Sequence, residues 1–113
     1  MENNFRRQKV ARQIQKDLGE IFRSKGMAAY GGAMITVSEV RMTPDLAEAK
    51  IYLSIFPSDK SEAVIRQVEH ENKTVRGELG NRVRHQLRIV PELKFFPDDT
   101  LDKLARIDEL LKK

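Results

Sequence analysis

The chain has 113 residues, a formal net charge of +4 and no cysteine. This length suits one domain with a modest core, and the lack of cysteine excludes disulfides, a thiol nucleophile and thiolate zinc sites. No apolar run approaches the length of a membrane span, and the N-terminal sequence MENNFRRQ lacks the apolar core of a signal peptide. We therefore expect a single domain over residues 1–113 of a soluble, cytoplasmic protein, without a metal or another cofactor.

A basic amphipathic helix is predicted over residues 5–24. Its apolar side recurs at helical spacing and consists of Val10, Ile14, Leu18, Ile21 and Phe22. Residues 5–25 carry seven basic side chains against two acidic ones, which is a net charge of +5. The predicted helix therefore combines an apolar side with a strongly cationic one.

Two strands follow, over residues 34–42 and 47–56, and the TPDL segment between them predicts an antiparallel hairpin. The second strand alternates cleanly between apolar and polar residues, whereas the first alternates imperfectly. Tyr52 and Phe56 fall on the side of the second strand that is opposite its aliphatic row. Aromatic side chains at such positions usually pack across strands, so we expect packing there, and base stacking is the alternative.

Two consecutive helices are predicted next. The first begins at about Lys60, after an N-cap at Ser58 or Asp59. Its apolar side consists of Ala63, Val64 and Val68. The apolar row then fails, and an interhelical kink is predicted at Glu71, Asn72 and Lys73, because asparagine tolerates left-handed backbone geometry.

The second of these helices is predicted over residues 74–88. It must stop near Val90, because Pro91 disfavours helical geometry in the residue before it. A third strand is expected over residues 92–97. A last helix, with Asp98, Asp99 and Thr100 at its start, is expected to bury Leu101, Leu104, Ile107 and Leu111. The order α-β-β-α-α-β-α predicts an α+β domain, in which a three-stranded sheet has helices on one face.

The helix over residues 74–88 places a cationic line beside an apolar row. Val75, Leu79, Val83 and Leu87 form the row, and Lys73, Arg76, Gly80 and Arg84 form the line. Gly80 leaves a gap in this line, where another backbone could approach closely. Residues 73–94 carry six basic side chains against two acidic ones, which is a net charge of +4.

Two cationic segments in one small domain indicate binding to a polyanion. The alternative is a solvated charged surface, and the presence of two such segments favours nucleic acid. The candidate binding residues are Arg6, Arg7, Lys9, Arg12, Lys16, Lys73, Arg76, Gly80, Arg84 and Arg88.

Three further motifs favour structural interpretations. Residues 77–80 read GELG, a GxxG pattern that clamps nucleic-acid backbones in KH domains. The apolar row runs through this pattern, so we expect residues 77–80 to be helical. A backbone clamp is the minority alternative. The acidic residues 98–102 resemble a magnesium motif, yet acids at a helix start usually act as caps. His70 and His85 have no spaced partner that would make them metal ligands or catalytic groups.

The element order α-β-β-α-α-β resembles the type II KH fold of RNA-binding proteins. At the level of residues, the chain resembles the ribosome-binding factor A family. The similarity covers nearly the whole chain, including RRQKVARQIQKDLGEIF, ITVSEVRMTPDLAEAKIYLSIF and VRGELGNRVRHQLRIVPELKFFPDDTLDKLARIDELL. The most specific part is the run from Arg88 to Leu93, followed by Phe95, Phe96 and then residues 99–101. The family's interhelical kink has an alanine and a glycine where this chain has Glu71–Asn72–Lys73.

The resemblance implies a function in ribosome assembly. Family members bind free 30S subunits through 16S rRNA, assist late rRNA folding and 5′-end processing, are needed most at low temperature and are not enzymes. The expected partners are thus the 30S subunit and 16S rRNA, with no small-molecule substrate and no membrane, and the expected state is a monomer. The resemblance also implies that the candidate binding residues given above contact rRNA. A generic single-stranded RNA-binding KH module and a domain that binds acidic proteins remain the alternatives.

Overall fold

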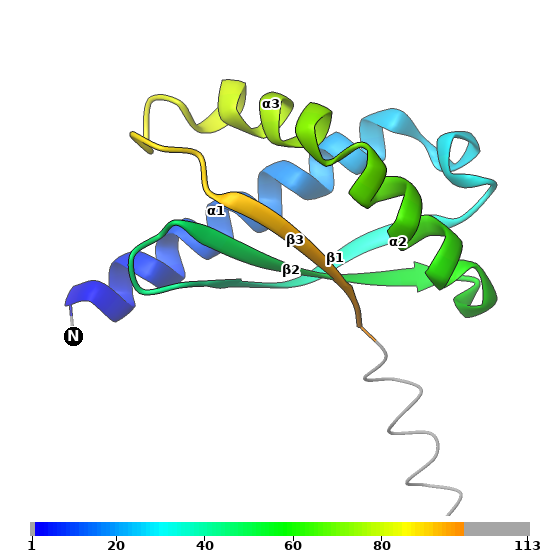
Figure 1. The fold of residues 1–113 in the computed structure, drawn as a ribbon, viewed down its shortest axis with the longest axis horizontal. Helices are drawn as coiled ribbons and strands as arrows, with labels where there is room; N and C mark the ends of the chain where they lie inside the picture. Colours follow the sequence, from blue (N-terminus) through cyan, green and yellow to red (C-terminus); the bar gives the residue numbers. More distant parts are fainter. Residues whose placement is uncertain (1, 99–113) are drawn as a thin grey trace, which may run out of the picture.

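The computed structural model describes residues 2–98. Its helices and strands are α1 (Glu2–Lys25), β1 (Met34–Met42), β2 (Glu48–Phe56), α2 (Ser61–His70), α3 (Asn72–Val83) and β3 (Glu92–Pro97) (Figure 1). This order confirms the predicted α-β-β-α-α-β core of a KH-like (type II) α+β domain. The predicted last helix lies outside the described residues. Between residues 2 and 98, no helix has the length and apolar character needed to cross a membrane.

The sheet has the order β1-β2-β3, so β2 is its central strand. β1 pairs antiparallel with β2, as predicted, and β3 pairs parallel with β2. A β-bulge lies between Val37 and Glu39 in β1. Because the bulge inserts one residue, Val37 and Val40 both face the core although they are three positions apart. The bulge therefore explains why the first strand alternates imperfectly in the sequence.

The three helices pack on one face of the sheet (Figure 1). From β2 this face supplies the buried residues Ala49, Ile51, Leu53 and Ile55, and from α1 it receives Ile14, Leu18, Ile21 and Phe22. Val75, Leu79 and Val83 of α3 are fully buried in the same cluster. The apolar rows that were predicted from spacing thus form one continuous core, which fixes α1 and α3 side by side.

Helix α3 is shorter than predicted. It ends at Val83, whereas a helix was predicted over residues 74–88. The backbone amides of Gln86 and Leu87 both donate to the Val83 carbonyl, which closes a tight turn. The chain then returns along α3, where Arg76 holds it through two hydrogen bonds. The segment after the turn is thus held to α3 by the side chain of Arg76.

The start of α2 also differs from the prediction. The short 3-10 turn Ser58–Lys60 precedes the helix, and Lys60 occupies the N-cap without a side-chain hydrogen bond, so the expected cap at Ser58 or Asp59 is wrong. Val64 and Val68 are buried as expected, but Ala63 is exposed and does not belong to the buried side of the helix. Between α2 and α3 only Glu71 lies outside the helices, and Asn72 already begins α3.

Candidate nucleic-acid interface

A line of cations runs along the solvent side of α1. Lys9, Arg12, Lys16 and Arg23 recur at spacings of three, four and seven, which places them on one side of a helix. All four are exposed. Within residues 2–98, none of the four makes an ion pair with an acidic side chain. We call these four residues the α1 stripe.

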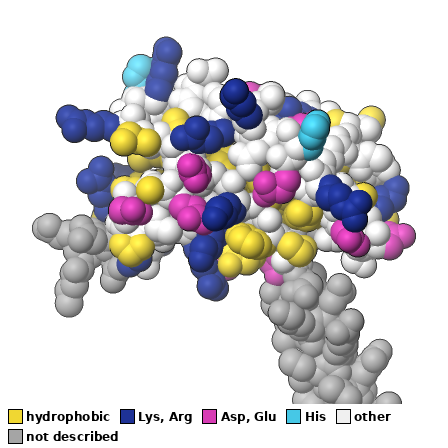
Figure 2. All heavy atoms as spheres, viewed as in Figure 1, with side chains coloured by type: hydrophobic (Ala, Val, Ile, Leu, Met, Phe, Trp, Pro, Cys, Tyr) yellow, Lys and Arg dark blue, Asp and Glu magenta, His cyan; other side chains and the backbone are white. Residues whose placement is uncertain are grey.

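The segment between α3 and β3 adds cations beside the N-terminal half of α1. Arg84 and Arg88 are exposed on this segment. A groove of about 330 Å³ lies between the segment and α1 and is lined by Arg6, Lys9, Val10, Gln13, Gln86 and Leu87. Lys9 belongs to both the groove and the α1 stripe, so the two sets of cations border one surface. Figure 2 shows Lys and Arg side chains around this end of the molecule, at the left of the view.

The seam between α1 and α3 is also rich in charge, but its charges are paired. Arg82 Nη1 lies 2.6 Å from Glu20 Oε2 and 3.9 Å from Asp17 Oδ1. Lys25 Nζ lies 3.2 Å from Glu78 Oε1. Because acidic neighbours neutralise these two cations, the seam attracts phosphate less than the α1 stripe does.

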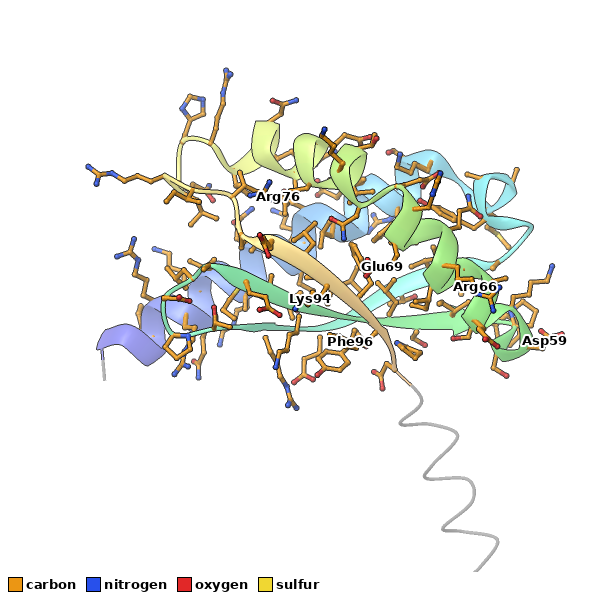
Figure 3. The ribbon with its side chains drawn as sticks, in the orientation of Figure 1. Asp59, Arg66, Glu69, Arg76, Lys94 and Phe96 are labelled. Atoms are coloured by element: carbon orange, nitrogen blue, oxygen red, sulfur yellow. The ribbon has the colours of Figure 1, made fainter. Side chains whose placement is uncertain are left out.

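Arg76 and Gly80 hold the chain where it returns along α3. The Arg76 guanidinium donates to the carbonyl of Val90 at 2.6 Å and to that of Pro91 at 3.0 Å (Figure 3). A Cβ at Gly80 would lie 3.1 Å from Val90 Cγ2. The gap that Gly80 leaves in the predicted cationic line is therefore filled by the chain itself. The middle of that line has a structural role, and only its ends are exposed.

The predicted binding residues fall into several groups. Arg6, Lys9, Arg12, Lys16, Arg84 and Arg88 are exposed on α1 and on the segment after α3. Arg7 is half-buried and makes a contact of its own. Lys73 is exposed at the other end of α3, about 16 Å from Arg84 along the helix at 1.5 Å per residue. Arg23 was missed by the prediction, although its spacing of seven from Lys16 could have identified it.

The break between α2 and α3 covers the outer edge of the sheet. Asn72 Nδ2 donates to the Leu93 carbonyl at 2.8 Å. The Phe95 amide donates to Oε1 of Glu69 at 2.8 Å, and Glu69 is labelled in Figure 3. β3 is an edge strand, and the unpaired groups of such a strand can template pairing with another chain. The side chains around the break therefore satisfy β3 and block its edge.

Glu71, at the break itself, lies close to a buried tyrosine. The hydroxyl of Tyr30 and Oε2 of Glu71 are both buried, and neither has a hydrogen-bond partner among the described residues. Burial, followed by the negative charges of Glu71 and Glu78, raises the pKa of Tyr30 from 10.0 to about 12. The hydroxyl therefore stays protonated at neutral pH and belongs to the packing of the core.

The other motifs do not converge on a site. Residues 77–80 lie inside α3, so they form helix, as expected, and not a loop that could clamp a backbone. His70 and His85 are both exposed. Over the described part of the chain, no three His, Asp or Glu side chains are grouped to hold a metal ion. Of the acidic residues 98–102, only Asp98 is described.

The open face of the sheet carries an aromatic cluster. Tyr52 stacks on Phe96 of the neighbouring strand, with ring centroids 5.5 Å apart and planes inclined by 29°. The Arg41 guanidinium lies over Tyr52, 5.5 Å from its centroid. The expected cross-strand packing of Tyr52 is thus confirmed. Phe56, by contrast, is 70% exposed.

Comparison with known families matches residues 6–111 to the family model of Ribosome-binding factor A. A ribosome-binding factor A from Cytophaga hutchinsonii is 40% identical over 110 residues, which are 97% of this chain and 83% of that relative. The chain belongs to the ribosome-binding factor A family.

The fold of this family member agrees with that of solved structures. The crystal structure of ribosome-binding factor A from Thermus thermophilus matches with a TM-score of 0.68 at 22% identity, over 80% of this chain and 94% of that chain. A homology model of the Thermus thermophilus protein, fitted into a cryo-EM map of a 30S–RbfA complex, matches with a TM-score of 0.64 at 24% identity, over 78% and 90% of the two chains. These matches support the α+β architecture described above.

Proposed function

We propose that this protein is a maturation factor that binds the free 30S ribosomal subunit through 16S rRNA. Its family membership supports this proposal, as does the Thermus thermophilus relative that was fitted into a map of a 30S complex. The observation that carries the proposal is a set of exposed cations on the α1 stripe and after α3 that make no ion pair with an acidic side chain of residues 2–98. A surface of this kind attracts a polyanion.

Phosphate contacts supply most of the proposed binding energy. The residues proposed to make them are Arg6, Arg7, Lys9, Arg12, Lys16, Arg23, Lys73, Arg84 and Arg88. Arg76 and Gly80 contribute by holding the segment that carries Arg84 and Arg88. If six cations reach phosphate, affinity falls by about 10³ to 10⁵ between 50 and 200 mM salt. Specificity then comes from the shape of the folded rRNA, because side chains cannot read the deep groove of A-form RNA.

The proposed role of this binding is to assist late folding and 5′-end processing of 16S rRNA, most strongly at low temperature. This part of the proposal rests on the resemblance to the family. Misfolded RNA helices escape by breaking base pairs, and that step slows on cooling, so a protein that holds immature rRNA gains importance in the cold. The protein acts by binding, as a cytoplasmic monomer, and carries out no chemical step.

Co-sedimentation tests the proposal. The purified protein is mixed with 30S subunits, 50S subunits and 70S ribosomes at 50 and 200 mM salt. We expect binding to free 30S subunits alone, weakened by the higher salt. Equal binding to all particles that is lost together as salt rises would show a non-specific affinity for polyanions and would contradict the proposal.

A pair of charge-matched variants tests the surface. Arg84→Glu with Arg88→Glu changes two exposed cations beside the groove, and we expect loss of 30S binding with an unchanged melting temperature. Lys50→Glu with Arg66→Glu makes the same change in net charge on the open sheet face and on α2, and we expect binding to persist. If both variants bind equally well, the chosen surface is wrong.

A cold-sensitivity experiment tests the role in assembly. In cells that lack the protein, we expect 16S rRNA with an unprocessed 5′ end to accumulate on cooling. The wild-type chain restores processing, and the variant Arg84→Glu with Arg88→Glu does not. Restoration by this variant would separate processing from the proposed rRNA surface.

A generic KH module that binds short single-stranded RNA is less well supported. Residues 77–80 lie within α3, so the described chain offers no GxxG loop to clamp an RNA backbone. Gel-shift assays with short RNAs distinguish the two functions. Tight binding to short RNA without preference for 30S subunits would favour the generic module.

A further inference from the structure

The groove between α1 and the segment after α3 has an apolar floor and a cationic rim. Val10 and Leu87 are half-buried, pack against the core and form the floor. Arg6 and Lys9 are exposed and stand at the rim. Among the residues that the structure describes, none that lines the groove carries a carboxylate. The groove therefore suits a ligand that joins a flat apolar group to a negative charge.

Two glutamine side chains add hydrogen-bonding groups to this groove. Gln13 Nε2 donates to Asp17 Oδ2 at 2.9 Å, which fixes the amide and leaves its Oε1 as an acceptor. Gln86 is exposed, and its backbone amide is already bonded to the Val83 carbonyl. The side-chain amide of a glutamine can both donate and accept hydrogen bonds. Together the two side chains can bond the polar edge of a flat group that lies on the floor.

The early end of α3 creates the groove. α3 stops at Val83, and the N-terminal half of α1 extends beyond that end. The groove lies where further turns of α3 would otherwise pack against α1. Arg76 and Gly80 hold the returning chain beside α3, which keeps Leu87 at the floor. The groove is thus set by the fold and does not depend on the position of one surface side chain.

We propose that this groove takes one unstacked nucleotide of single-stranded RNA. The base lies on the apolar floor, its edge meets the two glutamines, and its phosphate meets the two cations. The volume of about 330 Å³ is at the lower end of the range of ligand pockets, about 300 to 1,000 Å³, so it suits one nucleotide and excludes a duplex. Unstacked bases are recognised in this way, by apolar contact and by hydrogen bonds to their edges. The inference rests on the proposed function, because the RNA in question is that of the 30S subunit.

Site-specific crosslinking identifies what occupies the groove. The chain has no cysteine, so Gln86→Cys provides a single attachment point for a photo-crosslinker in the complex with 30S subunits. Lys50→Cys, on the open sheet face, is the matched control. We expect position 86 to crosslink to rRNA, at one nucleotide that stops reverse transcription, and position 50 to give no such stop. A crosslink from position 86 to a ribosomal protein, or no crosslink, would overturn the proposal.

The salt dependence of binding separates the base contact from the phosphate contact. Gln86→Ala removes a hydrogen bond to the base, so we expect 30S binding to weaken about two- to tenfold without a change in the salt slope. Lys9→Ala removes a phosphate contact, so we expect the slope of log affinity against log salt to fall by about 0.7 to 0.9. If wild-type protein binds 30S subunits and Gln86→Ala has no effect, only the groove proposal fails. If wild-type protein does not bind 30S subunits, both proposals fail.

Discussion

The two sides of α1 use cations in opposite ways. On the solvent side, the α1 stripe has no acidic partner within the described chain. On the side that faces α3, Lys25 of α1 is neutralised by Glu78, and Arg82 of α3 is neutralised by Glu20 of α1. Exposed ion pairs add only about 0 to 1 kcal/mol to stability, so the main effect of pairing in the seam is to remove charge that could attract phosphate. The position of the acidic residues, more than the number of cations, thus locates the candidate interface.

Arg76 represents a third use of a cation. Its partners are backbone carbonyls of Val90 and Pro91, so its charge serves the fold of the segment before β3. Hydrogen bonds from a charged group are stronger than those between neutral groups. The comparison of stripe, seam and Arg76 therefore predicts which changes affect binding and which affect stability.

The largest expected effect is on binding, from charge reversal in the α1 stripe. Arg12→Glu with Lys16→Glu removes two phosphate contacts and introduces repulsion, so we expect the affinity for 30S subunits to fall by about 100-fold or more. Both side chains are exposed and make no ion pair with the described part of the chain, so we expect the free energy of unfolding to change by no more than about 0.5 kcal/mol. Co-sedimentation and urea unfolding measure the two quantities, and Lys50→Glu plus Arg66→Glu is the charge-matched control for binding. Equal loss of binding in the control would remove the distinction between the stripe and the rest of the surface.

The next largest expected effect is on stability, and it distinguishes Arg76 from the paired cations of the seam. Arg76→Met keeps most of the aliphatic stem but loses both hydrogen bonds to carbonyls, and we expect a loss of about 2 to 4 kcal/mol in the free energy of unfolding. Arg82→Met loses ion pairs at a partly exposed site, so we expect a loss below about 1 kcal/mol. Urea unfolding of the two variants provides the test. Similar losses would mean that Arg76 is no more structural than a surface ion pair.

A smaller effect distinguishes the two glycines of α3. Gly77 has open space where a Cβ would lie, so Gly77→Ala should stabilise the protein by about 0.5 to 1 kcal/mol through higher helix propensity. At Gly80 the new Cβ would lie 3.1 Å from Val90 Cγ2, so the gain is offset by displacement of the segment that Arg76 holds. We expect Gly80→Ala to be less stable than Gly77→Ala by about 1 kcal/mol or more. Thermal unfolding measures the difference. Equal stabilisation would show that Val90 moves away from the new Cβ without a loss of stability.

The core and the sheet could be predicted from the sequence because each depends on local spacing. Val75, Leu79 and Val83 recur every fourth residue, and the row is buried as that spacing requires. The alternation over residues 47–56 likewise placed the central strand within one residue of its observed start. These signals need no knowledge of distant parts of the chain.

The end of α3 and the fate of its cations depend on tertiary contacts and could not be predicted in this way. Pro91 sets a limit beyond which a helix cannot continue, but α3 ends earlier, at Val83, and Arg76 bonds the carbonyls of Val90 and Pro91 in the segment that follows. Gln13 and Gln86 are 73 positions apart and have no spacing pattern, so nothing in the sequence marked the groove that they share. The cationic line of α3 also looked continuous in the sequence, because its spacing does not show that Val90 and Pro91 lie against Arg76 and Gly80.

The smallest expected effect at neutral pH concerns Tyr30, next to the acidic side chains at the seam and at the break. Burial and the charges of Glu71 and Glu78 raise its pKa to about 12, above the ordinary value of 10.0. The folded state therefore disfavours the tyrosinate, and the stability that this difference contributes is present below pH 10 and is lost as the pH rises towards 12.

Tyr30→Phe removes the titrating hydroxyl and keeps the ring that packs edge-on against Phe22, with centroids 6.0 Å apart in the wild type. It also removes a buried hydroxyl that lacks a hydrogen-bond partner among the described residues, so at pH 7 we expect unfolding free energies within about 1 kcal/mol of each other. Between pH 10 and 12 the wild type should lose stability relative to the variant, as measured by urea unfolding at several pH values. The two proteins differ only in the hydroxyl of residue 30, so the difference between the two curves isolates Tyr30. Parallel curves would show that the Tyr30 hydroxyl ionises as easily in the folded chain as in the unfolded one. In that case, burial and the nearby glutamates do not raise the pKa of Tyr30.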